Sequence, residues 1–211
     1  MNVKPSPVVG LIILLLVALV PMAVSAQPVA PAAADADPRT VVSTLESALI
    51  ASMKAGTRLD LGQRKAALAP VVERSLDVPR MARFIFGARW RTLSEVDRER
   101  FIATFSELSV TTYADRFDQH KGERFDPVSE TAQGDSRMLV RSRFTKGSGD
   151  TVAFDYLLMR GDDGWRVVNI LTDGISDLAL KRSQYGALYD RDGMDAVIAR
   201  IREQIDDDHG G

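Results

Sequence analysis

Hydrophobic residues recur every three or four positions through much of the segment from residue 38 to residue 122, a spacing typical of helices with one apolar face. Capping residues and glycines mark helix ends, as at Asp37 before Pro38 and at Gly56. The predicted helices cover residues 38–55, a stretch from Gln63 that Pro70 is expected to break, residues 78–87, and residues 94–122.

After Gly122 the hydrophobic period changes to two, which predicts strands. Pro127 places the first strand at a sheet edge, because proline cannot donate to a neighbouring strand. Two amphipathic helices follow, one from Ser176 and one from Asp192. The predicted strands cover residues 124–131, 137–144, 152–159 and 165–171. This order predicts one α+β domain over residues 38–206, with helices packed on a twisted antiparallel sheet of about four strands.

The last two predicted strands are apolar on both faces. Alternation puts Val167 and Leu171 on one face of the last strand, and Val168 and Ile170 on the other. A sheet face that contacts only water does not have this composition. Either helices cover both faces of the sheet, or one face forms an apolar surface for a ligand.

The first 26 residues have the pattern of a secretory signal peptide. Lys4 supplies positive charge, residues 8–20 form an uncharged apolar run, and residues 24–26 fit a signal-peptidase site. We expect export to the periplasm with cleavage after Ala26; an uncleaved membrane anchor is the alternative. The Ala/Pro-rich residues 27–37 are expected to form a flexible linker, and residues 207–211 a disordered tail.

The composition excludes several classes of function. The chain of 211 residues has no cysteine, hence no disulfide framework, thiolate zinc site or cysteine nucleophile. Its two histidines, His120 and His209, lie far apart in the sequence, which argues against a histidine metal site. A net charge of −2 argues against a generally basic nucleic-acid-binding surface. We therefore expect no metal, no cofactor and no nucleic-acid partner.

Sequence motifs for catalysis are also missing. There is no nucleophile elbow, Walker loop or dinucleotide-binding glycine pattern. Asp155, beside Tyr156 in an apolar strand, has the surroundings that would raise the pKa of a general base. The alternative, which we favour, is an ion pair with Arg141 or Arg143 on the neighbouring strand. We therefore expect no catalytic residues and a protein that is not an enzyme.

Arg137, Arg141, Arg143 and, just beyond the second predicted strand, Lys146 are expected to form a basic stripe on one strand face. One interpretation is a docking surface for an acidic protein or for lipid phosphates. The other is a solvated sheet face with cross-strand ion pairs, and the sequence supports both equally.

Several segments resemble one family of proteins. Residues 81–91 (MARFIFGARWR) resemble the signature of the MlaC family of periplasmic lipid-binding proteins, also called toluene-tolerance proteins. Other segments resemble the family in the same order, at residues 100–105, 112–114, 165–170, 173–176 and 182–185. The resemblance covers residues 40–203, and residues 173–179 also resemble the hopanoid-associated branch, HpnM.

This resemblance implies a helical layer around a twisted antiparallel sheet, similar to nuclear-transport-factor-like folds. Between the two layers it implies an apolar pocket for the acyl chains of a phospholipid or hopanoid. It further implies a carrier that moves lipid between an outer-membrane lipoprotein/porin complex and an inner-membrane ABC transporter with a mammalian-cell-entry domain. We expect a monomer that binds lipid as cargo.

Export, the lack of catalytic motifs and the surplus of apolar strand residues all fit a carrier. Exposing about thirty methylenes to water costs on the order of 24 kcal/mol, at ~0.8 kcal/mol each. An exported isomerase-like enzyme on a similar cone-shaped fold, using Asp155, and an adaptor that binds through the arginine strand are the alternatives. The residues predicted to line the lipid pocket are Phe101, Phe105, Phe144, Phe154, Tyr156, Leu158, Val167 and Leu171.

Overall fold

The computed structural model describes residue 1 and residues 36–207. The expected signal peptide (1–26) and nearly all of the expected linker (27–37) and tail (207–211) lie outside these residues. At the margins, Asp37 caps the first helix and Asp207 is the last residue of the final helix. Among residues 36–207, no helix combines the length and the apolar composition needed to cross a membrane.

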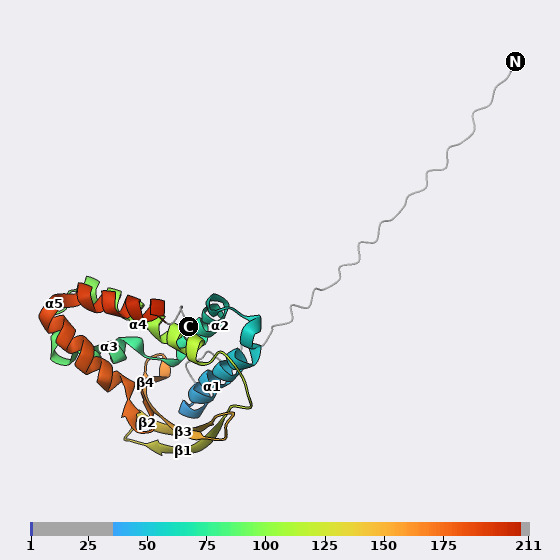
Figure 1. Ribbon diagram of the computed structural model, residues 1–211. Helices are drawn as coiled ribbons and strands as arrows, with labels where there is room; N and C mark the ends of the chain where they lie inside the picture. Colours follow the sequence, from blue (N-terminus) through green and yellow to red (C-terminus); the bar gives the residue numbers. More distant parts are fainter. Residues whose placement is uncertain (2–35, 208–211) are drawn as a thin grey trace. The chain divides into compact units, whose positions relative to one another are not determined.

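Five α-helices and one sheet form the described part of the chain (Figure 1). The helices are α1 (Pro38–Ala55), α2 (Leu61–Ser75), α3 (Val78–Phe86), α4 (Glu95–Arg116) and α5 (Asp177–Asp207), with short 3-10 turns at Gly56–Arg58 and Gly87–Arg91. The strands are β1 (Arg124–Ala132), β2 (Arg137–Thr145), β3 (Thr151–Gly161), β4 (Gly164–Thr172) and β5 (Ile175–Ser176). The predicted α+β class is confirmed, and the two-residue β5 is an addition to the four strands expected.

The sheet is an antiparallel meander in the order β1-β2-β3-β4-β5. β1 lies at the edge as Pro127 predicted, and the register shifts between Pro127 and Ser129. The other end of the sheet is closed by the α2–α3 connection, where the backbone N–H of Asp77 donates to the carbonyl of Val167 at 2.8 Å. This bond satisfies a carbonyl that would otherwise be free at the exposed edge of β4.

The helices cover only one face of the sheet (Figure 1). This inner face carries Val140, Tyr156 and Val167, which are buried with residues of α1 to α5 in one hydrophobic core. The opposite, outer face carries the exposed Arg137, Arg141 and Arg143. Apolar residues on both faces had two possible explanations. The explanation in which helices cover both faces of the sheet is therefore wrong.

A register shift in β4 changes which of its side chains face inward. Leu158 pairs with Val167 but Leu157 pairs with Asn169, so Val168 has no partner of its own in the ladder. Beyond this bulge Ile170 lies opposite the inward Tyr156, and Leu171 lies opposite Asp155 on the outer face. The prediction that Leu171 shares a face with Val167 is wrong, because one extra residue inverts the alternation.

Two helix predictions also need correction. α2 continues through Pro70, which is exposed while Leu68 and Val72 on either side are buried. Because the proline lies on the solvent side, core packing holds the helix together across it. α4 ends at Arg116 rather than at Gly122. The two predicted C-terminal helices are confirmed, because α5 consists of two helices joined by a kink at Gly193 (φ 78°).

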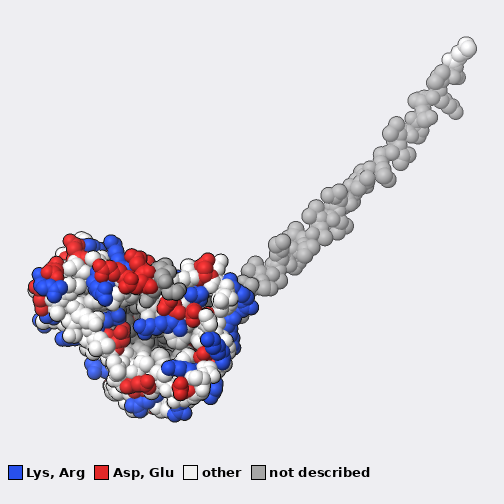
Figure 2. All heavy atoms as spheres, viewed as in Figure 1, with Lys and Arg blue, Asp and Glu red and all other residues white. Residues whose placement is uncertain are grey.

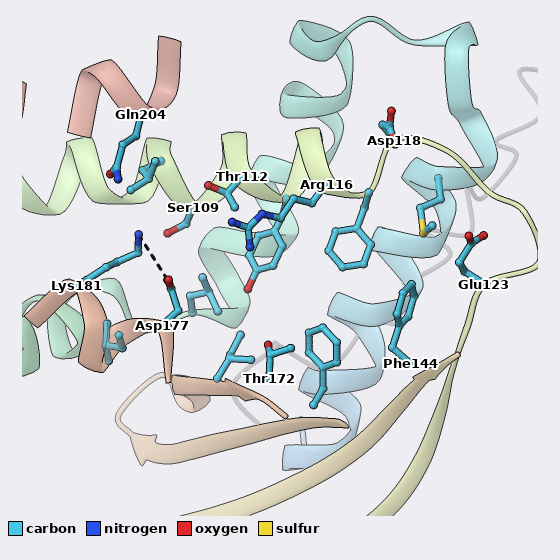
Figure 3. Close-up of a pocket in the computed structure, with 18 of the residues that line it drawn as sticks. Ser109, Thr112, Arg116, Asp118, Glu123, Phe144, Thr172, Asp177, Lys181 and Gln204 are labelled. Atoms are coloured by element: carbon cyan, nitrogen blue, oxygen red, sulfur yellow. Dashed lines mark ion pairs between the residues drawn. The ribbon is translucent and has the colours of Figure 1, made fainter. Parts of the chain in front are cut away.

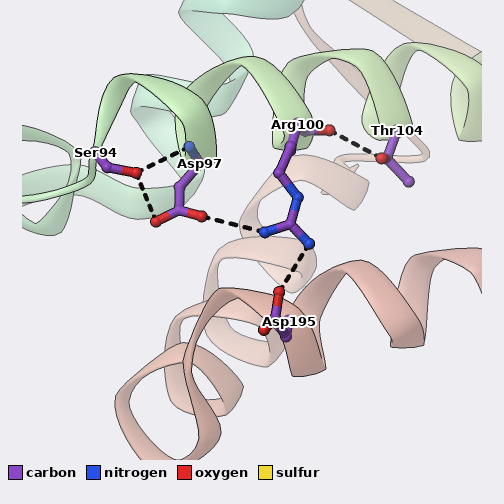
Figure 4. Close-up of polar contacts among 5 residues, drawn as sticks. All are labelled: Ser94, Asp97, Arg100, Thr104 and Asp195. Atoms are coloured by element: carbon purple, nitrogen blue, oxygen red, sulfur yellow. Dashed lines mark hydrogen bonds and ion pairs between the residues drawn. The ribbon is translucent and has the colours of Figure 1, made fainter.

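The N-terminus of α4 is joined to α5 by a polar network (Figure 4). The Ser94 hydroxyl accepts a hydrogen bond from the backbone N–H of Asp97 at 3.0 Å and so caps the helix. One turn later the Arg100 guanidinium contacts Asp97 at 3.4 Å and Asp195 of α5 at 2.7 Å. These contacts hold α5 beside α4, and the two helices together form part of the wall described next.

A candidate lipid-binding cavity

A cavity of about 1190 Å³ lies between the helices and the inner face of the sheet. It is larger than the roughly 300–1,000 Å³ pockets that hold drug-sized ligands. Figure 2 shows the molecule hollowed on this side, with charged side chains around the hollow. The apolar residues that line it are Met53, Leu76, Met81, Phe105, Leu108, Phe117, Phe144, Phe154, Ile170 and Leu178.

Aromatic rings form one continuous wall of the cavity. Phe144 of β2 lies with its ring centroid 5.8 Å from Phe117 and 6.1 Å from Phe154, in both cases nearly edge to face. Phe125 of β1 extends the cluster, 4.7 Å from Phe144. Such contacts orient the rings and keep this wall apolar. The wall suits hydrocarbon and provides no catalytic groups.

Charged and polar side chains border the cavity on two sides (Figure 3). Asp118 and Glu123 lie on the side of Phe144, and Arg116, Asp177 and Lys181 lie across from it. Lys181 of α5 pairs with Asp177 at 3.6 Å, one turn apart on the same helix. Arg116 extends from α4 into the cavity, and no ion pair to it occurs among residues 36–207 (Figure 3). Lys121 and Lys146 also line the cavity. An apolar interior with a charged mouth matches an amphiphilic ligand.

Tyr113 of α4 also lines the cavity. Burial raises the pKa of its phenol, the nearby Asp177 raises it further, and Arg116 opposes both effects. Because the phenol stays protonated at neutral pH, it can donate a hydrogen bond into the cavity.

The structure separates the predicted lining residues into three groups. Phe105, Phe144 and Phe154 line the cavity. Leu171 lies on the outer face, and Ile170 takes its place at the cavity wall. Buried in the core, and not among the lining residues, are Phe101, Tyr156, Leu158 and Val167. Whether any of them contacts lipid stays a prediction.

The candidate base Asp155 and its neighbour Tyr156 do not meet at the cavity. Asp155 pairs with Arg141 at 3.4 Å on the outer face, which confirms the cross-strand ion pair. Tyr156 faces the opposite way and is 1% exposed, and burial raises the pKa of its phenol well above its ordinary value. In the described part of the chain, no cluster of three acidic or histidine side chains could hold a metal ion.

Sequence reasoning missed the polar residues of α4. Ser109, Thr112, Tyr113 and Arg116 recur at spacings of three, one and three, on the helix face that begins with Phe105. That stripe was readable from the sequence, because residues three and four apart share a helix face. A polar stripe continuing an apolar one was the available signal for a ligand site.

A second missed residue is Glu46 of α1, which is 7% exposed. It lines a smaller cavity of about 600 Å³ between α1 and the inner face of β1 and β2. Its carboxyl faces the hydroxyls of Ser142 and Tyr156, and its Oε1 has no hydrogen-bond partner. The helical spacing of α1 indicated this position, because Glu46 lies four residues after Val42 and three residues before Leu49 on the apolar face.

These features define a class: an α+β protein with a large apolar cavity and a charged mouth between its helices and one face of its sheet. Residues 43–203 match the model of the family described as MlaC protein. This match covers most of the chain, and the chain therefore belongs to the MlaC family. The predicted resemblance is confirmed, while the HpnM branch stays a prediction.

The chain is similar to two relatives with phospholipid in their names. The intermembrane phospholipid transport system binding protein MlaC of Haemophilus influenzae is 22% identical over 123 residues, 56% of this chain and 58% of that protein. The chain thus matches little more than half the length of this curated relative. The phospholipid-binding protein from Ralstonia solanacearum, solved in complex with a phospholipid, has a TM-score of 0.72 at 20% identity, over 82% of this chain and 99% of that one. The second likeness shows a shared fold.

Proposed function

We propose that this protein is a periplasmic carrier that binds the acyl chains of a phospholipid in the cavity. The observation that carries this proposal is the cavity itself, about 1190 Å³ with an apolar wall from Phe105 to Ile170 and a charged mouth. The two relatives support it, because the name of one and the solved complex of the other both concern phospholipids.

The physical task of a carrier is to keep hydrocarbon out of water. Two acyl chains with about thirty methylenes would lose on the order of 24 kcal/mol if exposed. A dry cavity removes this penalty without having to bind lipid more tightly than a membrane does. Exchange with a membrane then lies near balance, and partner proteins can set its direction.

A phospholipid fits the mouth better than a hopanoid does. Arg116, Lys121 and Lys146 line the mouth and form no ion pair within the described residues. Cations without an ion-pair partner beside an apolar cavity can donate charge-assisted hydrogen bonds to a lipid phosphate. The hopanoid cargo suggested by residues 173–179 is therefore the second candidate.

The proposed partners are an outer-membrane lipoprotein/porin complex and the mammalian-cell-entry protein of an inner-membrane ABC transporter. The protein would reach them from the periplasm as a monomer, exported by residues 1–26. Arg137, Arg141 and Arg143 on the outer face are the proposed docking surface. The isomerase-like alternative is not favoured, because Asp155 and Tyr156 point to opposite faces of the sheet.

Charge placed on the cavity wall tests the carrier function. Phe144→Glu should abolish bound lipid in organic extracts of the purified protein, since a carboxylate next to hydrocarbon costs several kcal/mol. Phe84→Glu is the matched control, because Phe84 is 42% exposed on α3 and does not line the cavity. A Phe144→Glu protein that melts normally and still carries a full complement of lipid would contradict the proposal.

A further inference from the structure

The residues of α4 that line the cavity change from apolar to hydroxyl-bearing to charged along the helix. Phe105 and Leu108 are apolar, Ser109, Thr112 and Tyr113 carry hydroxyls, and Arg116 carries the charge. The eleven residue steps from Phe105 to Arg116 span roughly 16 Å at about 1.5 Å per step. A diacyl phospholipid has the same order of groups: hydrocarbon, then ester and glycerol oxygens, then phosphate.

The other charged residues that line the cavity form no ion pair with Arg116 in the described part of the chain. Of the carboxylates there, Asp177 is engaged by Lys181 at 3.6 Å. Glu123 accepts backbone hydrogen bonds from Lys121 and from Gly147, and these bonds lower the pKa of its carboxyl despite its desolvation. The other charged residues that line the cavity are Asp118, Asp207, Lys146 and Arg200, of which Arg200 pairs with Glu203 at 3.1 Å.

We propose that Arg116 is the phosphate-binding residue of the cavity, so that the protein selects phosphorylated over unphosphorylated diacyl lipids. This inference rests on the proposed carrier function and adds the chemistry of recognition. The guanidinium can donate two parallel hydrogen bonds to a phosphate, a geometry that lysine cannot reproduce. Figure 3 shows Arg116 directed into the cavity, beside the hydroxyl-bearing Ser109 and Thr112.

Arg116 has another role that must be separated from this one. It lies in the last turn of α4, where any cation stabilises the helix through its dipole. Arg116→Lys keeps that charge and loses the bidentate geometry, whereas Arg116→Gln loses both. A role confined to helix stability would move the melting temperature and leave the choice of lipid unchanged.

The experiment is a competition between two lipids with the same acyl chains, phosphatidylglycerol and diacylglycerol, for the delipidated protein. Native mass spectrometry gives the ratio of the two complexes, and thermal melting gives the stability of each variant. The wild type should prefer the phospholipid, Arg116→Gln should lower this preference about tenfold, and Arg116→Lys should fall between. Arg202→Gln is the control, because Arg202 is exposed on α5 and does not line the cavity.

The outcomes separate this inference from the carrier function. An Arg116→Gln protein that keeps the wild-type preference overturns the phosphate assignment and leaves the carrier function standing. A wild type that binds both lipids equally does the same. A wild type that binds neither lipid contradicts both proposals. Excess inorganic phosphate should lower the wild-type preference for phosphatidylglycerol, because the two phosphates compete for Arg116. An equal loss of preference in the wild type and in Arg116→Gln would contradict the assignment.

Discussion

Glu46 is a carboxyl group placed where the protein has little to stabilise its charge. It packs between α1 and the inner face of the sheet, where it faces Ser142 and Tyr156. Burial is the main cause that raises the pKa of this carboxyl, and the two hydroxyls lower it by less. The basic residues Arg39, Lys54, Arg124 and Arg141 line the same small cavity, and Arg39, Arg124 and Arg141 are paired with other carboxylates.

This burial predicts how stability depends on pH. The folded state holds the Glu46 proton more tightly than the unfolded state does, so stability falls as pH rises from the ordinary carboxyl range through the raised pKa. Glu46→Gln removes that loss. It should raise the free energy of unfolding by roughly 1–2 kcal/mol at pH 8 and change it little at pH 4.

Urea denaturation at the two pH values measures this difference. Glu99→Gln is the control, since Glu99 is an exposed residue of α4 and its replacement should have the same small effect at both pH values. An equal effect of Glu46→Gln at pH 4 and pH 8 would show that Glu46 is not buried as a proton-binding group.

At the scale of elements, the bulge in β4 decides which side chains reach the cavity. Ile170→Glu should remove bound lipid, because Ile170 lines the cavity, whereas Leu171→Glu should leave binding intact on the outer face. Lipid extraction and thermal melting of both variants check this. Loss of lipid from Leu171→Glu but not from Ile170→Glu would contradict this. It would mean that side chains alternate without a bulge and that Leu171 lines the cavity.

The elements themselves were largely readable from the sequence, because caps and periodicity are local. Asp37, Asp77 and Ser94 cap helices where predicted, and Pro127 marks the edge strand. Two features were not readable, because they depend on packing: the helix that continues through Pro70 and the inverted alternation after Val168.

The candidate site was predicted less well than the fold, for a physical reason. A core and a ligand cavity use the same apolar residues, so the pattern could not distinguish Phe101, 0% exposed, from Phe144, which lines the cavity. The distinction depends on where two packed layers separate. Only the polar stripe that ends at Arg116 carried the needed information in the sequence.

In the whole molecule, the cavity and the proposed docking surface lie on opposite faces of the sheet. Arg137 and Arg143 are exposed on the outer face and form no ion pair within the described residues, while Arg141 pairs with Asp155. Reversing the charge of both unpaired arginines to glutamate should slow delivery of fluorescent phospholipid to vesicles that carry the inner-membrane partner. The rate should drop several-fold at low salt and little at high salt, since surface charges act mainly on encounter.

The same double variant should keep its melting temperature and its bound lipid, because neither arginine touches the core or the cavity. Delivery at the wild-type rate at low salt would show that these arginines do not dock a partner and only form a solvated sheet face.

The proposed function requires that the cavity holds one phospholipid. Native mass spectrometry of the protein, purified without detergent from the periplasm of its own cells, tests it most directly. The predicted spectrum shows the chain with one added mass per molecule, which extraction identifies as a diacyl phospholipid. A chain that carries no lipid, or that carries a small polar molecule in the same cavity, would contradict the account.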